Sequence, residues 1–333
     1  MTLLVTGGSG FIGSNFIRHI LQTYPSYKVI NYDLLTYAGN QESLRDLEKH
    51  PNYKFVKGNI TNIKRINQVI KSGQVTHIVN FAAESHVDRS ISNPSVFMIT
   101  NVVGTQVLLQ AALKNKVKRF HHVSTDEVYG SLSLRTKDKF NDKSIYDPRS
   151  PYSASKAGSD HIVNAYFHTY GLPVTISNCS NNFGPYQHPE KFLPRAITNL
   201  IENKPIVIYG DGKNIRDWLH VVDHCRAIDM ILHKGNLGET YLIGGQTTEI
   251  SNLTIAKKLL KIFGKDKTYL EFVQDRIGHD KKYAVDWSRI KKELGWEPLH
   301  NFDEWLIQTV NWYKGNTKWW KSLKIKAENY YRA

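Results

Sequence analysis

The sequence is poor in cysteine and has no internal repeat and no stretch of low complexity. Its two cysteines, Cys179 and Cys225, cannot build a disulfide framework and lack metal-ligand spacing, so we expect a cytoplasmic protein without a metal site. We find no apolar run approaching the roughly 20 residues that span a membrane. Because a strand pattern begins at Leu3, we expect no signal or transit peptide before it.

Long blocks of a single charge are also absent, although the formal net charge is +14. The basic residues are mostly lysines spread along the whole chain, whereas a nucleic-acid-binding protein gathers them on one face. We therefore expect no nucleic-acid partner and favour a small anionic ligand, such as a nucleoside diphosphate. The composition is 41% hydrophobic and 22% charged, as in globular proteins, and 333 residues suit roughly two domains.

The first motif is a short buried-strand pattern, 3–6, that runs into the glycine-rich segment 6–13, Thr-Gly-Gly-Ser-Gly-Phe-Ile-Gly, and then into an amphipathic helix. Strand, glycine turn and helix in this order are the context of a dinucleotide fingerprint. Glycines let the backbone approach a pyrophosphate, and the start of the helix offers free N–H groups. We predict a cofactor site at Gly7, Gly10, Phe11, Ile12 and Gly13.

An acidic residue about 20 residues further on, at the end of the second strand, would complete this fingerprint. The strand pattern at 28–33 ends on Asp33, in that place. A carboxylate there accepts hydrogen bonds from both ribose hydroxyls and repels a 2′-phosphate, so we predict NAD rather than NADP. The alternative for Asp33 is a solvated strand end or a helix cap.

Further strand and helix patterns alternate along the first half of the chain. We expect strands at 53–56, 76–81, at the start of the stretch 119–130 and at 173–177, and long helices at 95–115 and 152–170. The predicted fold class is α/β, a Rossmann-like doubly wound parallel sheet with a smaller, mixed α/β C-terminal substrate domain. The predicted division assigns 1–178 to the NAD-binding domain, with 218–240 returning to it, and 179–217 and 241–333 to the substrate domain.

Thr125, Asp126 and Glu127 follow the fifth predicted strand at its carboxyl end. In open α/β sheets the ligand crevice lies outside these strand ends, so the two adjacent carboxyls are well placed for acid/base chemistry. The alternative is that Asp126 and Glu127 only cap the turn that follows.

Tyr152 and Lys156 are four residues apart in a predicted helix and therefore share one face of it. A neighbouring ammonium lowers the pKa of a phenol, so Tyr152 is a candidate base for a sugar or alcohol hydroxyl. The alternative is a surface Tyr/Lys pair, but the preceding glycine-rich half favours a redox site.

Three polar loops in the second half of the chain, 178–191, 210–218 and 275–283, each carry basic side chains beside amides or aromatic rings. Such groups suit a phosphorylated ligand that bears a base. Solvation of the loop explains any one of these residues equally well. Their recurrence in three separate loops favours a diphosphate site.

Taken together, the residues resemble the dTDP-glucose 4,6-dehydratases, in the extended branch of the short-chain dehydrogenase/reductase superfamily. The segment 6–13 and Tyr-x-x-x-Lys are similar to the superfamily, and the more specific strings are 32–40, 82–90, 124–130, 181–191 and 216–218. Among them Thr-Asp-Glu discriminates best, because epimerases and decarboxylases on this scaffold generally lack the adjacent Asp-Glu pair. The resemblance extends over at least residues 1 to about 300.

The resemblance implies a reaction in three stages. Tyr152, helped by Lys156 and Thr125, would take the proton of the sugar 4-hydroxyl while hydride passes from C4 to NAD. Glu127 would remove the C5 proton as general base, and Asp126 would protonate the departing 6-hydroxyl as general acid. Hydride would then return to C6 and a proton to C5, giving dTDP-4-keto-6-deoxyglucose and restoring a tightly held NAD. Two carboxyls with opposite protonation states suit this elimination.

The resemblance also implies further binding residues. Asn59, Ile60 and Ala82, with Tyr152 and Lys156, would complete the cofactor site. The implied substrate contacts are Glu84, Ser85, His86, Asn182, Lys191, Arg216, Asn252, Arg276 and His279.

Three departures from the family pattern bear on these contacts. Asn59 stands where the family usually has Asp, although its side-chain carbonyl can still accept a hydrogen bond from the adenine amino group. Ile277 stands where the family usually has Pro, which leaves the shape of the loop at Arg276 open. The segment 131–148 is also shorter than the family pattern.

Three alternatives stay open at this point. The first is activity on UDP-glucose or another nucleotide sugar, since selecting thymine depends on one methyl contact worth about 1–3 kcal/mol. The second is a sugar-nucleotide epimerase, against which the Asp126–Glu127 pair argues. The third is a non-catalytic NAD-binding regulator or RNA-binding protein. The resemblance further implies a homodimer formed through the helices at 95–115 and 152–170.

Overall fold

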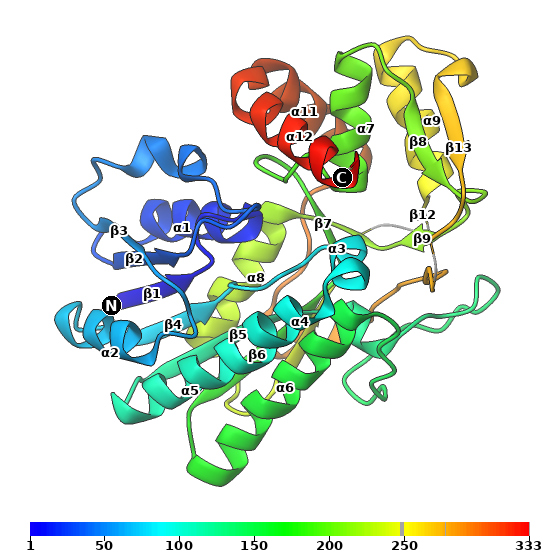
Figure 1. The fold of residues 1–333 in the computed structure, drawn as a ribbon. Coiled ribbons are helices and arrows are strands. Elements are labelled where there is room, and N and C mark those ends of the chain that lie inside the picture. The colour runs from blue at the N-terminus through cyan, green and yellow to red at the C-terminus, as the bar shows by residue number, and fades with distance from the viewer. Residues whose placement is uncertain (247–249, 277, 333) are drawn as a thin grey trace.

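The computed structural model describes residues 1–246, 250–276 and 278–332. A seven-stranded parallel sheet crosses the molecule in the order β11-β6-β5-β4-β1-β2-β3 (Figure 1). Its strands are β1 Thr2–Thr6, β2 Lys28–Asp33, β3 Tyr53–Lys57, β4 His77–Asn80, β5 Arg119–Thr125, β6 Val174–Cys179 and β11 Thr240–Ile243. The strand order reverses between β1 and β4, so a ligand crevice is expected outside their carboxyl ends. The predicted fold class is confirmed.

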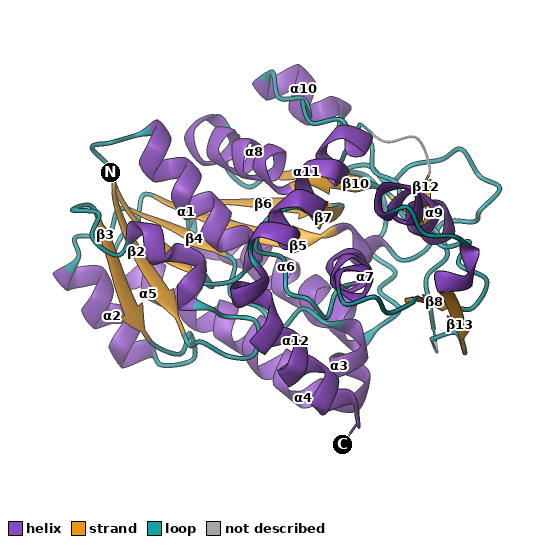
Figure 2. Cartoon of the chain, turned by 90° about the horizontal axis from the view of Figure 1, so that it is seen from above, coloured by secondary structure: helices purple, strands orange, loops and turns teal. Residues whose placement is uncertain are grey.

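Helices cover both faces of this sheet because apolar side chains point from the strands to either side. Leu3, Val5 and Val29 pack with α1 Phe11–Thr23 and α8 Val221–Lys234 on one face. Leu4 and Ile30 pack on the other face, against α2 Ile63–Ser72, α5 Thr105–Lys114 and α6 Pro151–Tyr170. Figure 2 shows the sheet enclosed between these helices.

The expected single helix at 95–115 is composite. It consists of α4 Pro94–Phe97, a π-helical segment Met98–Gly104 and α5, and it follows the short α3 Val87–Ser92. Among the described residues, Pro94–Lys114 is long and apolar enough to cross a membrane by length and composition. The expectation that no run approaches such a length was therefore wrong, because the isolated polar residues in this stretch leave its mean hydropathy high. Core helices pass the same test, and this segment packs along α6.

The remaining elements gather beyond the carboxyl ends of the sheet, where α7, α11 and α12 stand together (Figure 1). Three two-stranded pairs connect them: parallel β7–β10, antiparallel β9–β12 and parallel β8–β13. The bounds are β7 Asn181–Phe183, α7 Phe192–Ile201, β8 Ile206–Tyr209, β9 Ile215–Arg216, β10 Trp218–His220, β12 Ile250–Ser251, α9 Asn252–Phe263, β13 Leu270–Val273, α10 Ser288–Leu294, α11 Phe302–Gly315 and α12 Thr317–Arg332. A second apolar core joins α7, α9, α11 and α12.

Candidate active site

The glycine turn after β1 has a shape that only glycine fits. Gly7 has φ +67°, and a Cβ atom placed on it would lie 2.6 Å from the backbone nitrogen of Ala82. A Cβ atom on Gly13 would lie 2.4 Å from the Gly7 carbonyl oxygen. Gly10 begins α1 without any side-chain cap, so the first turn of the helix turns its N–H groups toward the crevice. This is the cradle of a pyrophosphate.

Asp33 is held rigidly at the end of β2. Its Oδ2 accepts a hydrogen bond from the Ser9 N–H at 2.9 Å and its Oδ1 accepts one from the Leu35 N–H at 2.7 Å. Burial raises the pKa of this carboxyl, and the two backbone donors oppose that rise. The alternative of a solvated strand end is wrong, because Asp33 is only 8% exposed.

Asn59 lies near this carboxylate, in the loop after β3. Its side-chain Oδ1 accepts a hydrogen bond from the Thr61 N–H at 2.9 Å, which orients the amide. A carbonyl oxygen has two lone pairs, so one remains for an adenine amino group. The departure at Asn59 is therefore compatible with the predicted contact.

A cavity of about 440 Å³ extends from the glycine turn to the end of β5. All of the predicted cofactor and catalytic residues line it: Gly7, Gly10, Phe11, Ile12, Gly13, Asp33, Asn59, Ile60, Ala82, Thr125, Asp126, Glu127, Tyr152 and Lys156. The cavity has the glycine turn at one end, the fixed Asp33 carboxylate beside it and polar side chains at the other end. This arrangement fits the pyrophosphate, ribose and nicotinamide of a dinucleotide.

Asp126 and Glu127 lie in a short 3₁₀ helix, Asp126–Tyr129, whose cap is Thr125. The Glu127 N–H donates to Thr125 Oγ1 at 3.3 Å, so neither carboxyl serves as the capping acceptor. Asp126 Oδ1 instead accepts a hydrogen bond from Thr125 Oγ1 at 3.4 Å, so the alternative that the two carboxyls only cap the turn is wrong.

The two carboxyls have different electrostatic surroundings. Burial and the nearby charges of Glu127 and Asp217 raise the pKa of Asp126 well above its ordinary value. Burial also raises the pKa of Glu127, but Lys191 and Arg216 oppose that rise. Asp126 therefore holds a proton more tightly than Glu127 does, which is the arrangement of an acid beside a base.

Tyr152 and Lys156 lie on the first turns of α6, which begins with a capping box between Ser150 and Ser153. The expected lowering of the Tyr152 pKa was wrong. Burial raises this pKa well above its ordinary value and the charge of Glu127 adds to the rise, while a hydrogen bond with Thr125 opposes it.

Lys156 itself is perturbed in the direction that burial dictates. Burial lowers the pKa of Lys156 to about 8, and the charge of Asp160 opposes that change. The ammonium donates to the Val123 carbonyl oxygen at 2.8 Å and lies 3.3 Å from His122 Nε2. One of its protons is thus directed to the protein backbone, and the pKa of Tyr152 remains raised.

A second cavity, of about 310 Å³, lies between the sheet and the C-terminal elements. It brings together eight of the nine predicted substrate residues: Ser85, His86, Asn182, Lys191, Arg216, Asn252, Arg276 and His279. The ninth, Glu84, lines the first cavity. The two cavities share Ser85, Glu127, Asn182 and Lys191 among their lining residues, so they meet at Glu127.

The basic residues of this second cavity are individually anchored. Lys191 Nζ donates to the Ser85 carbonyl oxygen at 2.6 Å. Arg216 donates to the Asp280 carbonyl oxygen at 3.0 Å and its guanidinium lies 4.4 Å from the centroid of the Tyr283 ring. Anchored cations at the wall of a cavity form a pre-organised site for an anion such as a diphosphate.

Other predicted contacts are less direct. Asn182 turns its side chain to Ser180 and His224, so its amide is already engaged within the protein. Arg276 forms an ion pair with Asp88. The Ile277 departure lies outside the described residues.

Asn101 is a residue of this region that the sequence did not single out. From the π-helical segment its Oδ1 accepts from the Glu84 N–H at 2.8 Å, and its Nδ2 donates to the Glu84 carbonyl oxygen at 3.0 Å. This pair of hydrogen bonds to one residue's backbone fixes Glu84 and Ser85 between the two cavities. A π-helical turn has no simple residue pattern, so only an asparagine within a long apolar run hinted at it.

Glu190 was also missed, although it precedes Lys191 in a recognised string. It lines both cavities and accepts a hydrogen bond from Arg89 at 3.0 Å. Its bond partner is 101 residues away in the chain, which no local pattern reveals.

The chain matches known proteins over nearly its whole length. Residues 4–309 match the family described as GDP-mannose 4,6 dehydratase. The dTDP-glucose 4,6-dehydratase of Mycobacterium tuberculosis is 46% identical over 333 residues, covering 100% of this chain and 99% of the relative.

Two solved structures named dTDP-glucose 4,6-dehydratase are also similar to this chain. The Bacillus anthracis structure, a complex with NAD, has a TM-score of 0.91 and 49% identity, and the match covers 97% of this chain and 99% of the other. The Streptomyces venezuelae structure, with NAD and dTDP bound, has a TM-score of 0.94 and 48% identity, and covers 97% and 100%.

Proposed function

This chain belongs to the dTDP-glucose 4,6-dehydratases, and we propose that it converts dTDP-glucose to dTDP-4-keto-6-deoxyglucose with bound NAD. It is thus a hydro-lyase of nucleotide-sugar metabolism that feeds deoxysugar biosynthesis. The observation that carries the mechanism is the Asp126–Glu127 pair. Glu127 lines both cavities, Asp126 lines the first, and the two carboxyls differ in their hold on a proton.

The cofactor would be held by the first cavity. Gly7, Gly10 and Gly13 would admit the pyrophosphate to the start of α1, and Asp33 would accept the adenosine ribose hydroxyls. When bound, NAD supplies the hydride acceptor for the sugar C4 and the hydride donor for C6. Asn59, Ile60 and Ala82 complete the walls of this cavity.

In this proposal Tyr152 receives the proton of the sugar 4-hydroxyl at its Oη, with Thr125 as its hydrogen-bond partner. Lys156 stabilises the phenolate that must form first, because an ammonium nearby favours the charged phenol. Since burial alone opposes that ionisation, the ammonium must stay protonated for Tyr152 to act as a base.

The elimination of water is assigned to the carboxyl pair. Oxidation at C4 acidifies the C5 hydrogen, and Glu127, set among cations, removes it as general base. Asp126 keeps its proton because of burial and two nearby acidic groups, and it gives that proton to the departing 6-hydroxyl. A redox site without elimination would not need this second acid/base pair, which is the argument against an epimerase.

The nucleotide part of the substrate would lie in the second cavity. Lys191, Arg216 and Arg276 would neutralise the diphosphate, with His279 and Asn252 beside it. Asn252 Oδ1 is buried and accepts no hydrogen bond within the described residues, so it is available to a ligand donor. Ser85, His86 and Glu84 would lie nearer the sugar.

We also propose that the chain divides into an NAD-binding part and a sugar-nucleotide-binding part. The first is 1–178 together with the return of the chain at 218–240, to which β11 at Thr240–Ile243 adds the edge strand of the same sheet. The second is 179–217 and the rest of the chain to 333. Separate apolar cores in the two parts support this division.

A homodimer and a cytoplasmic location are further proposals. Met98, Ile99 and Val103 are about half exposed on the π-helical segment beside α6, with exposed fractions of 49%, 54% and 48%. Such a stripe on a helix pair suits a symmetric contact with a second copy. Sedimentation analysis of Ile99→Glu beside the wild-type protein tests this contact, and a monomer is expected only for the variant. Two free, buried cysteines agree with a reducing compartment.

The activity is tested by incubating the purified protein with dTDP-glucose or UDP-glucose, without added NAD. We expect an alkali-labile keto-sugar chromophore with dTDP-glucose. Glu127→Gln should abolish the chromophore while leaving the NAD content of the protein unchanged. No chromophore with either sugar nucleotide, or unchanged turnover in the variant, would overturn the proposal.

A further inference from the structure

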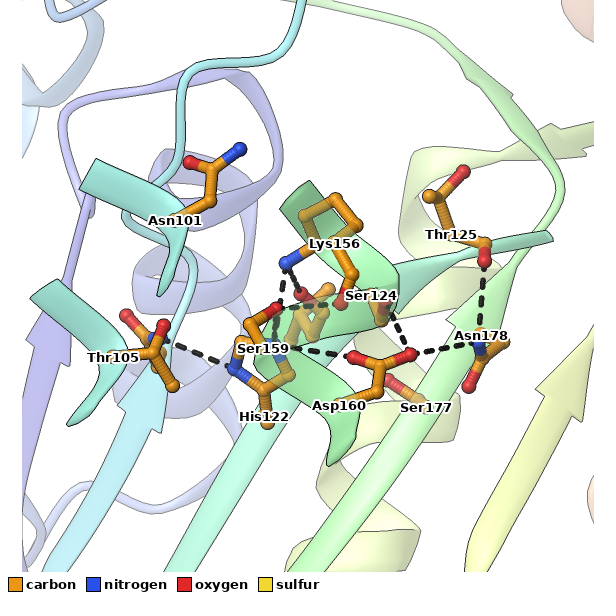
Figure 3. Close-up of polar contacts among 12 residues, drawn as sticks. Asn101, Thr105, His122, Ser124, Thr125, Lys156, Ser159, Asp160, Ser177 and Asn178 are labelled. Carbon is orange, nitrogen blue, oxygen red and sulfur yellow. Dashed lines mark hydrogen bonds and ion pairs between the residues drawn. The ribbon is translucent and has the colours of Figure 1, made fainter. Parts of the chain in front are cut away.

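Behind Lys156 lie two buried titratable residues that the proposed reaction does not use. His122 is on β5 and Asp160 is one turn beyond Lys156 on α6, and their exposed fractions are 1% and 0%. His122 Nε2 lies 3.4 Å from Asp160 Oδ1 and 3.3 Å from Lys156 Nζ. Figure 3 shows the imidazole between the ammonium and the carboxylate.

The hydrogen bonds around His122 assign its tautomer. The Ser159 hydroxyl gives its single proton to the Lys156 backbone carbonyl at 2.7 Å, so its oxygen must accept from His122 Nε2 at 3.0 Å. On the other side of the ring, Nδ1 lies 3.1 Å from the Asn80 amide nitrogen, which is a donor. The ring proton therefore sits on Nε2, directed at Ser159 and Asp160.

Asp160 is held by hydrogen-bond donors from several elements. Its Oδ2 accepts hydrogen bonds from Ser124 Oγ at 2.9 Å, Tyr146 Oη at 3.0 Å and Asn178 Nδ2 at 3.2 Å. A buried charge is costly unless another charge compensates it, and Lys156 lies on the far side of the same ring nitrogen.

We propose that Asp160 and His122 are a positioning pair for Lys156. The Asp160 carboxylate keeps the Lys156 ammonium protonated. The imidazole, with its proton on Nε2, offers Lys156 no inward acceptor. The ammonium then directs its protons to the Val123 carbonyl and into the cofactor cavity, where Tyr152 lies.

The charges around Lys156 determine the direction in which Asp160 shifts the Lys156 pKa. His122 from β5 is neutral, because burial lowers its pKa to about 4. Cys179 from β6 is neutral as well, because burial raises its pKa. Tyr152 on the same helix also holds its proton. Among these facing groups Asp160 is the main one that opposes the lowering of the Lys156 pKa by burial.

The decisive variant is Asp160→Asn, which keeps the shape and the acceptor oxygen but removes the charge. An opposite charge at this range shifts a pKa by about one to three units. We expect the Lys156 pKa to fall by at least about one unit, and the alkaline limb of kcat/KM against pH to move to lower pH by the same amount. At a fixed pH above that limb, activity relative to the wild type falls about tenfold per unit.

The effect of Asp160 on Lys156 can be measured both with the catalytic reaction and without it. The pH dependence of Lys156 acetylation by a small reagent, read by mass spectrometry on the NAD-containing protein, gives the Lys156 pKa without turnover. Only the expected shift of the alkaline limb of kcat/KM rests on the proposed function. If the protein proves inactive, the labelling result still decides whether Asp160 sets the charge of Lys156.

Matched controls lie next to the pair. His121→Asn removes a buried histidine that bonds Thr175 and Ser177, away from Lys156, and should leave the limb and the labelling pKa unchanged. Equal shifts in His121→Asn and Asp160→Asn, or no shift in Asp160→Asn, would overturn the proposal. If Asp160→Asn does not fold, ¹⁵N spectra of the wild-type histidines decide instead. A proton on Nδ1 of His122 would contradict the pair, and one on Nε2 supports it.

Discussion

The substitutions Asp126→Asn and Glu127→Gln are chemically similar but should have different effects on dTDP binding, because the two carboxyls carry different charges. Burial and the charges of Glu127 and Asp217 raise the pKa of Asp126 well above its ordinary value, so at neutral pH Asp126→Asn replaces one neutral group by another. The variant loses only the ability to donate a proton. We expect kcat on dTDP-glucose to fall about 10²–10⁴-fold, the usual contribution of a general acid, or about 3–5 kcal/mol of barrier.

Glu127→Gln should cost a similar factor in kcat, but it also removes a negative charge. Glu127 faces Lys191, Arg216 and Arg276, which hold its pKa down against burial, and it lines the cavity assigned to the diphosphate. Removing its charge should strengthen dTDP binding on the order of 1 kcal/mol, or about fivefold. Asp126→Asn should change dTDP affinity by less than about twofold, because no charge is lost.

Two assays on the same protein preparations measure these effects. The keto-sugar chromophore gives kcat, and calorimetric titration with dTDP gives the dissociation constant at neutral pH and constant ionic strength. If Asp126→Asn tightens dTDP binding as much as Glu127→Gln does, then Asp126 is ionised and cannot be the acid. A fall in kcat below about tenfold would remove Asp126 from the proton transfer altogether.

Two further predictions concern the cofactor turn and the α1–α8 contact. Gly7→Ala should weaken NAD retention by tenfold or more, on the order of 1–3 kcal/mol, because the residue has φ +67° and its Cβ would meet the Ala82 backbone at 2.6 Å. Cofactor content after gel filtration measures this. Asp229 is buried, which alone would raise its pKa, but hydrogen bonds from His19 and His233 lower that pKa to about 2. The ionised Asp229 therefore stabilises the folded protein fully above about pH 4, and this stabilisation is lost as pH falls toward 2. The pKa of His233 is raised, so the stabilisation from protonated His233 is lost as pH rises beyond the folded-state pKa of this residue. Asp229→Asn should thus lower the free energy of unfolding on the order of 2 kcal/mol near pH 5.5, and less near pH 8.5, in urea titrations.

The parts of this protein that follow local patterns were predictable from the sequence. The glycine turn needs strand, glycine and helix in order, and Asp33 must end the next strand, so the order of residues along the chain is enough to place both. The family and the reaction were predicted from strings such as Thr125-Asp126-Glu127, and the comparisons confirm both.

Properties set by burial were not predictable in the same way. The spacing of Tyr152 and Lys156 correctly placed both at one cavity, but it said nothing of how deeply each is buried. Burial reverses the expected direction for the Tyr152 pKa. The inward bonds of Asn182 likewise depend on His224, 42 residues away, which no periodicity connects to it.

The carboxyl pair shows why adjacent residues can carry opposite roles. Asp126 lines the first cavity only, with the acidic Glu127 and Asp217 near it, whereas Glu127 lines both cavities. The cations that oppose the rise of the Glu127 pKa come from three separate segments of the second half of the chain: Lys191 before α7, Arg216 in β9 and Arg276. The proposed division into acid and base thus depends on residues that the second half of the chain places beside Glu127. Any change that loosens the contact between the halves should therefore reduce elimination more than cofactor binding, because the glycine turn and Asp33 belong to the first half.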